Sequence, residues 1–374
     1  MDEVDCQLRP HRPLRPPELA GVHLATTPEL CGHGLTGLRM LVYPPSMHDP
    51  IAAKYAHLED PGIREFMIAG ERLYPPDAVT FTLAEQRRFY DLYCTHFRKP
   101  RPVSVTAQDF QAGHVPCRLY KTNGTAAPPV MLYLHGGGFV LGGLDSHDDV
   151  CAEISDGADI AVIGIHYRLA PEHIFPAALE DCDTVLRHIA RHGDELGIDR
   201  SKIIVGGDSA GGNLAAALAL KARDEGGPEM LGQVLIYPGL GGDITKGSYV
   251  TEANAPGLSL ADIEYYRKTY CGPDGSPGHA SKYAAPLKET DYRGLPPAFL
   301  VAAGLDPLHD DCVEYASRLQ AAGVPVWVRD EPLLVHACLR ARHMSDPARD
   351  SFHAIVEACF SLAHRGQLPD QDPR

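Results

Sequence analysis

The chain has 374 residues, which is enough for two domains of ordinary size or for one large α/β domain with an appendage. Its hydrophobic content of 44% and its charged content of 22% are typical of a soluble globular protein. The 34 Lys and Arg against 49 Asp and Glu give a formal charge of −15, which argues against a nucleic-acid-binding protein and against a polybasic membrane anchor.

The first hundred residues show no strand pattern. Residues 1–40 are rich in Pro, His and Leu without a clear period, so we expect coil with a short helix. Residues 46–70 and 83–97 carry apolar side chains at helical spacing, which predicts helices.

The pattern changes near residue 102, where apolar and polar residues begin to alternate as in strands. Short apolar runs rich in β-formers then alternate with helical segments. Runs of this kind are typical of central strands covered on both faces, and their alternation with helices predicts a mostly parallel α/β sheet flanked by helices. The runs are 130–134, 160–165, 202–205, 234–237, 298–302 and 324–328. The helical segments are 148–156, 177–192, 211–224 and 310–321, with a final helix over 346–364.

One insertion interrupts the alternation. About sixty residues separate the strand that ends near Pro238 from the strand that starts near Pro297, and they hold a helix over 259–270 and a Gly- and Pro-rich loop. An insertion of this length in an α/β fold is usually functional.

A G-x-S-x-G pentapeptide, Gly207 to Gly211, lies between a predicted strand and a predicted helix. This context places a serine on a sharp turn whose flanking positions must lack bulk, and the helix N-terminus behind it favours a developing negative charge. We therefore predict that Ser209 is a nucleophile. Asp208, inside the turn, is interpreted as a structural residue.

A second glycine-rich turn, HGGGF at 135–139, directly follows the run at 130–134. Its glycines leave backbone N–H groups open, and such groups can stabilise a carbonyl oxygen that gains charge. The glycines lack the spacing of a phosphate-binding loop. His135 is interpreted as structural, bonding nearby backbone.

Together with YRLAPEH at 167–173 and FPAALED at 175–181, these two motifs resemble the hormone-sensitive-lipase family of α/β-hydrolases, called family IV among bacterial lipolytic enzymes. The resemblance covers about residues 100–365. It implies an α/β-hydrolase fold and a serine carboxylesterase with a helical cap over its pocket. It also implies an oxyanion hole made by the backbone N–H groups of Gly137, Gly138 and Ala210.

In this fold the nucleophile is followed along the chain by the acid and then by the base. Asp306 comes directly after the run at 298–302, and the resemblance agrees because the family carries Asp-Pro-Leu there. Asp310 and Asp311 compete for this role, but they fall inside the following helix, where a solvated or helix-dipole role is expected.

His336 follows the last predicted strand and is the expected base. His343, in an Arg-flanked segment, and His309, next to the acid, are its rivals. The family usually has His-Gly-Phe here, whereas this chain has Ala337 and Cys338 after His336, a change that keeps the base and alters its packing. No metal and no cofactor are expected, because the sequence has no H-E-x-x-H or paired-cysteine ligand spacing.

The predicted catalytic domain spans residues 96–240 and 291–374. Residues 1–95 and 241–290 are not needed for its core, and we expect them to pack together into a cap that shapes the acyl pocket. The candidates to line that pocket, each of which would otherwise be core of the cap, are Tyr265, Tyr266, Tyr270, Phe66 and Met67.

Ten cysteines without a C-x-x-C pair are expected to be free thiols in a reducing compartment. No secretory signal and no long apolar stretch is visible, so a cytoplasmic protein without an integral membrane segment is predicted. The expected partner is a small-molecule ester, with no nucleic acid, and the protein is expected to be a monomer or homodimer. Acyl transfer, amide hydrolysis and a non-catalytic receptor on the same fold remain alternatives.

Overall fold

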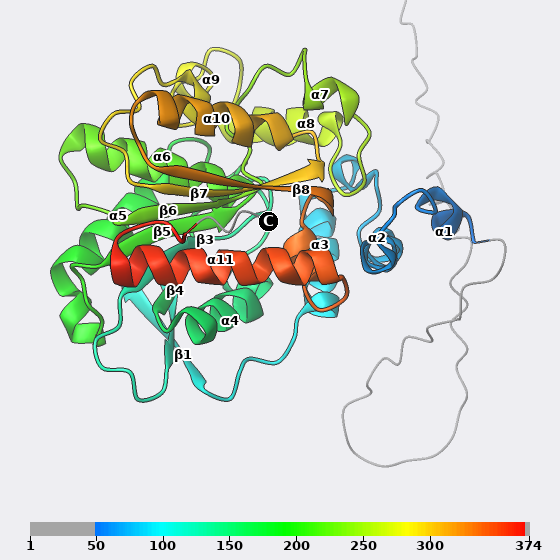
Figure 1. The fold of residues 1–374 in the computed structure, drawn as a ribbon. Coiled ribbons are helices and arrows are strands. Elements are labelled where there is room, and N and C mark those ends of the chain that lie inside the picture. Colours follow the sequence, from blue (N-terminus) through cyan, green and yellow to red (C-terminus); the bar gives the residue numbers. More distant parts are fainter. Residues whose placement is uncertain (1–48, 371–374) are drawn as a thin grey trace, which may run out of the picture. The chain divides into compact units, whose positions relative to one another are not determined.

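An eight-stranded sheet in the order β1-β2-β4-β3-β5-β6-β7-β8 forms the centre of the computed structural model, which describes residues 49–370 (Figure 1). The strands from β4 through β3 to β8 pair in parallel, whereas β2 pairs antiparallel with β1 and with β4. The mostly parallel α/β sheet predicted from the sequence is thus confirmed. The strands are β1 Val105–Ala112, β2 Val115–Thr122, β3 Val130–Leu134, β4 Ala161–Ile165, β5 Ile203–Asp208, β6 Gly232–Ile236, β7 Ala298–Leu305 and β8 Val326–Val335.

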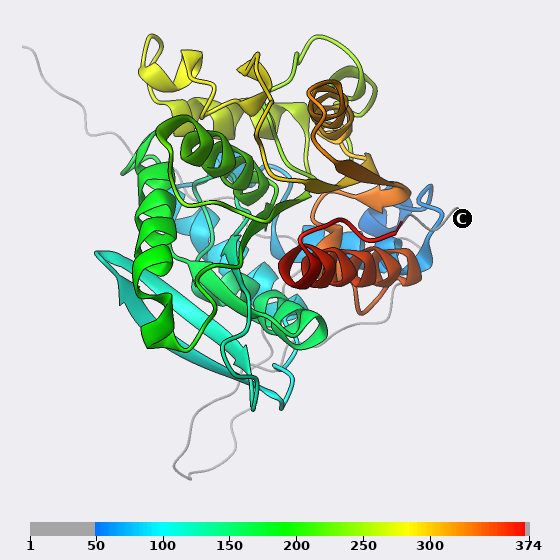
Figure 2. The same cartoon turned by 60° about the vertical axis from the view of Figure 1, so that its left-hand side comes forward.

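Helices cover both faces of the sheet. In Figure 1, α4 and α11 lie on one face, and α5, α6 and α10 lie on the other. Figure 2 shows the β1–β2 hairpin at one edge. The bounds are α1 Pro50–Lys54, α2 Pro61–Leu73, α3 Leu83–Phe97, α4 Asp148–Ala158, α5 Ala177–His192, α6 Ala210–Glu225, α7 Ser248–Thr251, α8 Leu260–Cys271, α9 Pro277–Ala280, α10 His309–Ala321 and α11 Asp346–Arg365. Between residues 49 and 370, no helix combines the length and the apolar character needed to cross a membrane.

The core consists of two apolar clusters, one on each side of the sheet. The packing of β3 explains why its sequence is continuously apolar. Val130, Leu132 and Leu134 face the cluster that contains α5 and α6, while Met131 and Tyr133 face the cluster that contains α4 and α11. Every residue of β3 is buried, because both of its faces are covered.

The predicted helix over 46–70 is wrong in its extent, because the chain forms two helices there. α1 and α2 each begin with a proline, and the side chains of Asp49 and Asp60 accept hydrogen bonds from the first free backbone N–H groups. Two such caps within twelve residues separate the helices. Residues 1–40, for which coil and a short helix are predicted, lie outside the described residues, as do residues 46–48.

The last two strands are longer than the sequence predicts. β7 runs to Leu305 and β8 to Val335, with a register shift between Ala303 and Leu305. A Cβ on Gly304 would lie 2.6 Å from the Cα of Pro332, so only glycine allows the two strands to approach there. β7 therefore ends directly before Asp306, and β8 ends directly before His336.

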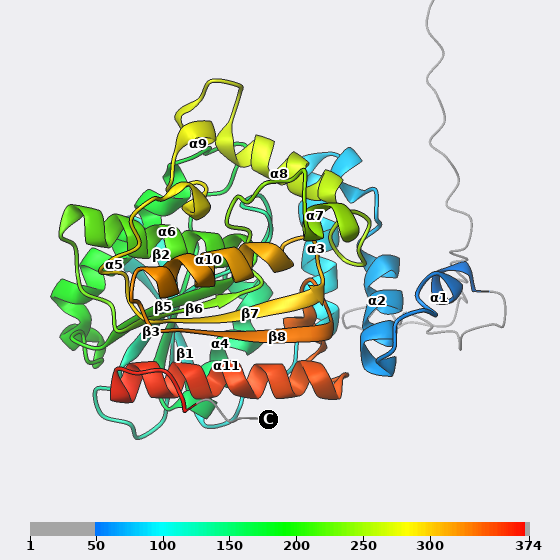
Figure 3. The same cartoon turned by 45° about the horizontal axis from the view of Figure 1, so that its top comes forward.

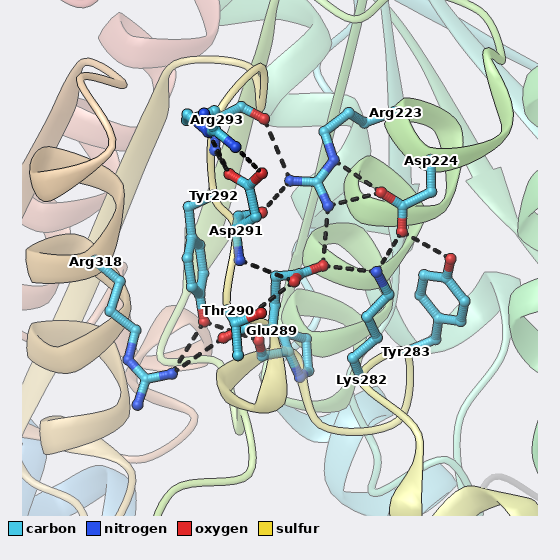
Figure 4. A network of polar contacts seen from close by, with 11 residues as sticks. Arg223, Asp224, Lys282, Tyr283, Glu289, Thr290, Asp291, Tyr292, Arg293 and Arg318 are labelled. Atoms are coloured by element: carbon cyan, nitrogen blue, oxygen red, sulfur yellow. Dashed lines mark hydrogen bonds and ion pairs between the residues drawn. The ribbon is translucent and has the colours of Figure 1, made fainter.

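A polar network fixes the segment that returns from the insertion to β7 (Figure 4). Glu289 is 6% exposed, and its carboxylate accepts hydrogen bonds from Arg223 of α6 at 2.9 Å and from Lys282 at 2.7 Å. Arg318 of α10 donates to the hydroxyl of Tyr292 at 3.3 Å. The segment is therefore held to α6 and to α10 by charged side chains.

Candidate active site

Ser209 occupies the turn between β5 and α6. Its backbone has φ 55° and ψ −117°, a conformation that non-glycine residues rarely adopt. A Cβ on Gly207 or on Gly211 would overlap the carbonyl oxygen of Leu134 in the neighbouring strand β3. The two glycines of the pentapeptide are therefore needed for close packing, and the strained turn exposes the serine hydroxyl at the carboxyl end of the sheet.

Asp306 and His336 lie within hydrogen-bonding distance of each other and of this turn. The Nδ1 atom of His336 is 2.6 Å from Oδ2 of Asp306, and its Nε2 atom is 2.9 Å from Oγ of Ser209. Asp306 is fully buried, and its Oδ1 atom accepts a hydrogen bond from the backbone N–H of Leu308 at 2.9 Å. The carboxylate, imidazole and hydroxyl thus form one continuous chain of hydrogen bonds.

Ala337 stands where the family's His-Gly-Phe motif has glycine, and it keeps a backbone conformation typical of glycine. Ala337 has φ 61° and ψ 17°, which is the left-handed region that a glycine would adopt without strain. The ring of His336 packs against Tyr237, with 4.9 Å between ring centroids. The imidazole is held between this ring and Asp306.

The rival acids bond elsewhere. Asp310 lies in the first turn of α10 and accepts a hydrogen bond from the backbone N–H of Ser248 at 3.0 Å. Asp311 also lies in the first turn of α10, as the helix-dipole alternative predicts, but it is not solvated, because it is buried and accepts hydrogen bonds from the N–H of Leu240 and the hydroxyl of Tyr249. Burial raises the pKa of Asp311 to about 6.

The rival histidines also have other partners. His309 lies 3.0 Å from an oxygen of Asp310 and 3.2 Å from one of Asp330. His343 lies 3.0 Å from an oxygen of Glu153, at the helix α4. Neither is within hydrogen-bonding distance of the serine.

The glycine turn after β3 presents open backbone donors. Gly137 and Gly138 have φ angles of 125° and 61°, and Gly137 closes the turn by accepting hydrogen bonds from Val140 and Leu141. Within residues 49–370, the N–H groups of Gly137 and Gly138 have no acceptor. Ala210 is the first residue of α6, where a helix leaves its N–H groups free.

Residues 131–340 match the family described as alpha/beta hydrolase fold. The chain belongs to the alpha/beta hydrolase family. Esterase LipI of Mycobacterium tuberculosis (strain ATCC 25618 / H37Rv) is 41% identical over 300 residues, which cover 78% of this chain and 90% of that protein. Carboxylesterase NlhH of the same strain is 44% identical over 239 residues, covering 64% of this chain and 72% of that protein.

Solved structures agree. A bacterial heroin esterase has a TM-score of 0.74 at 33% identity, covering 81% of this chain and 99% of that one. The ester hydrolase EH1AB1 from the metagenome of Lake Arreo has a TM-score of 0.75 at 32% identity, covering 82% of this chain and 99% of that one. The resemblance inferred from the motifs is confirmed.

In this alpha/beta hydrolase, Asp208 joins the serine turn to the glycine turn. Its Oδ1 atom accepts hydrogen bonds from the backbone N–H of Gly136 at 3.0 Å and from the hydroxyl of Tyr133 at 2.8 Å. Burial acts to raise the pKa of Asp208, but His147 and Arg340 lower it below its ordinary value. The carboxylate therefore stays charged and holds the glycine turn, in agreement with a structural role.

His135 braces the same turn. Its Nδ1 atom lies 2.9 Å from the carbonyl oxygen of Gly136, and its ring stacks on Tyr167 at 4.3 Å between centroids. The hydroxyl of Tyr167 donates to the carbonyl oxygen of His135 at 2.6 Å. Burial lowers the pKa of His135 to about 3, so the ring is neutral and structural as the sequence suggests.

Sequence reasoning missed a buried cation behind this turn. Arg340 donates to the carbonyl oxygen of Ser146 at 2.9 Å, and it lies 5.6 Å from the ring centroids of Tyr90 and Tyr93. His147 lies between Arg340 and Asp208. No motif marks these residues, because the pair is formed by segments 193 residues apart.

A cavity of about 80 Å³ opens beside Ser209, and Gly138, Ala210 and the α8 residues Tyr266 and Tyr270 are among its lining residues. Of the five side chains expected to line a pocket, only these two tyrosines do so.

The other three candidates have different surroundings. The hydroxyl of Tyr265 lies 3.0 Å from the amide nitrogen of Gln86 in α3. Phe66 and Met67 are buried in the apolar cluster with α4 and α11, so the pocket role is wrong for them.

Proposed function

We propose that the protein is a serine carboxylesterase that hydrolyses short- to medium-chain acyl esters. The observation that carries the proposal is the hydrogen-bond chain from Asp306 through His336 to Ser209, with distances of 2.6 and 2.9 Å, at the wall of a cavity. The esterase names of its relatives support it.

In the proposed mechanism, Nε2 of His336 takes the proton of Ser209 as the oxygen attacks the ester carbonyl. The protonated imidazole then gives this proton to the leaving alcohol, and an acyl-enzyme forms on Ser209. A water molecule, deprotonated by the same imidazole, attacks the acyl-enzyme and releases the acid. Asp306 orients the imidazole and stabilises its positive form.

The negative charge that develops on the carbonyl oxygen is assigned to the N–H groups of Gly137, Gly138 and Ala210. Each such donor is worth about 2.7–4 kcal/mol in the transition state of related reactions. Gly138 and Ala210 line the cavity with Ser209, which supports their part in the assignment. The mechanism needs no metal and no cofactor.

The cavity volume of about 80 Å³ is well below the roughly 300–1,000 Å³ of pockets for drug-sized ligands, which favours acyl chains of a few carbons. We propose that residues 241–290, which supply lining residues such as Tyr266 and Tyr270, form a cap together with residues 49–95. The remainder of the predicted N-terminal part of the cap, residues 1–48, lies outside the described residues. Two contacts support this assignment within the described part of residues 1–95. Tyr74 meets Tyr266 hydroxyl to hydroxyl at 3.0 Å, and the amide of Gln86 donates to the hydroxyl of Tyr265. Figure 3 shows α8, which carries both of these partners, near α3. A cytoplasmic location remains a prediction.

The test uses p-nitrophenyl acetate, butyrate, octanoate and decanoate with the wild type, with Ser209→Ala and with Ser201→Ala as a control at an exposed serine. We expect the highest kcat/KM for acetate or butyrate, and a loss of at least about 10³-fold in Ser209→Ala alone. Absence of turnover with every ester, or full turnover by Ser209→Ala, would overturn the proposal. Acyl transfer would instead give mixed esters when a second alcohol is added.

A further inference from the structure

The cavity beside the serine contains one charged side chain. Arg267 of α8 is half-buried and lines the cavity together with Ser209 and Ala210. It is the only Lys, Arg, Asp or Glu among the described residues that line it.

The guanidinium of Arg267 also lacks a partner. Among residues 49–370, no carboxylate lies within 4.0 Å of it, and it makes no hydrogen bond to a side chain or a carbonyl oxygen. Other buried or half-buried arginines of the described residues have partners, such as Arg87 with Glu172 and Arg342 with Asp149, whereas those that lack one, such as Arg88 and Arg191, are exposed. A partly desolvated guanidinium without a counter-ion is costly, and a planar anion can bind it through two hydrogen bonds.

The position of Arg267 on its helix directs it to the cavity. Ile263, Tyr266, Arg267 and Tyr270 follow one another at helical spacing, and all four line the cavity. The positive charge of Arg267 acts on Tyr249, another lining residue, where it partly opposes the rise in pKa that burial causes. The charge therefore lies close to the space that a substrate would fill.

The cavity belongs to the acyl side of the proposed site. The leaving oxygen must come within reach of Nε2 of His336, because it takes a proton from that atom. His336 is not among the lining residues of the cavity, whereas Gly138, Ser209 and Ala210 are. An acyl chain bound to Ser209 would thus extend toward Arg267.

We propose that Arg267 binds a carboxylate at the far end of a short acyl chain, so that half-esters of short dicarboxylic acids are the preferred substrates. The hydrolysis of such half-esters rests on the proposed function, whereas the binding of a carboxylate by Arg267 does not depend on it. Ser209 and Arg267 line the same cavity, and its volume of about 80 Å³ favours a short acyl chain.

The test compares two ethyl esters with acyl chains of similar shape, monoethyl succinate and ethyl 4-methylpentanoate, by measuring the ethanol released. We expect the wild type to favour the succinate in kcat/KM. Arg267→Gln should lower the ratio of the two values by about 10- to 100-fold, as for loss of a hydrogen bond to a charged group. Lys268→Gln, which removes an exposed positive charge from the same helix, should leave the ratio unchanged. Arg267→Lys should give a ratio between those of the wild type and Arg267→Gln.

A binding measurement separates the two proposals. By calorimetry, succinate should bind the wild type more tightly than the uncharged succinamide does, and Arg267→Gln should abolish the difference. If both esters are hydrolysed with equal kcat/KM, or if the ratio of the two values is unchanged in Arg267→Gln, the inference is overturned and the proposed esterase function stands. Hydrolysis of neither ester, with succinate still bound through Arg267, overturns the proposed function and leaves the carboxylate site.

Discussion

Gly138→Ala is the substitution whose effect the structure defines best. Gly138 has φ 61°, and a Cβ built on it would overlap the ring of Tyr266, whose hydroxyl is bonded to Tyr74. An alanine therefore strains the backbone and also displaces either the turn or the helix α8.

The two effects have different sizes and different readouts. A left-handed alanine costs about 1–2 kcal/mol, which lowers the free energy of unfolding by that amount. Ordinary carbon contacts lie at about 3.5–4.0 Å, so relief of the overlap needs a movement of about 1 Å. Misplacement or loss of one oxyanion donor lowers kcat by about 10²–10³-fold, with a smaller change in KM.

The assay measures kcat and KM with p-nitrophenyl butyrate and the free energy of unfolding in urea. Gly294→Ala is the matched control, because Gly294 has φ 73° and its nearest neighbour in space would be Cδ of Arg223 at 3.7 Å. It should lose about 1 kcal/mol of stability and no activity. In the double variant with Tyr266→Ala, kcat should recover at least tenfold over Gly138→Ala. Normal kcat in Gly138→Ala, or equal losses of kcat in Gly138→Ala and Gly294→Ala, would refute the reasoning.

Three further predictions follow from single side chains. Ala337→Gly should raise the free energy of unfolding in urea by about 0.5–1 kcal/mol, because it removes a left-handed alanine, and a loss of stability would contradict this. Asp306→Asn should lower kcat by about 10³–10⁴-fold at pH 7 by favouring the wrong tautomer of His336, and a smaller loss than tenfold would rule out the assigned role. Glu289→Gln should lower stability by about 2 kcal/mol at pH 7, because it weakens the hydrogen bonds that the carboxylate accepts from Arg223 and Lys282. Burial acts to raise the pKa of Glu289, but the hydrogen bond from Lys282 and those from backbone N–H groups lower it to about 2. The carboxylate therefore stabilises the fold above its unfolded pKa near 4.5, and the deficit of the variant should vanish as the pH falls from 5 to 2, which urea titrations at several pH values can follow.

The parts of the site that the sequence predicts are those encoded locally. Gly207, Ser209 and Gly211 lie within five consecutive residues between a predicted strand and a predicted helix, so the pentapeptide is sufficient to locate Ser209, although the glycines themselves are required by the contact with Leu134 of β3. Asp306 and His336 could be placed because each follows a strand, and chain order then assigns their roles.

The parts that the sequence does not predict depend on contacts between distant segments. β8 continues through Arg329 to Pro332, where the apolar pattern stops, because pairing with β7 holds it there. Asp311 is buried because it receives N–H groups from the loop after β6. For Arg267 a signal does exist, since it shares a helical face with Tyr266 and Tyr270, although only the cavity shows which way that face points.

The helix α8 supplies lining residues of the cavity but none of the groups that carry the proposed reaction. Tyr266 and Arg267 stand on α8, whereas Ser209, Asp306 and His336 stand at the ends of sheet strands. Sequence drift in α8 can therefore change which acyl chains are accepted while the reacting atoms stay in place. In a laboratory evolution experiment, a library restricted to the cavity face of α8 should yield altered substrate ranges more often than inactive enzymes.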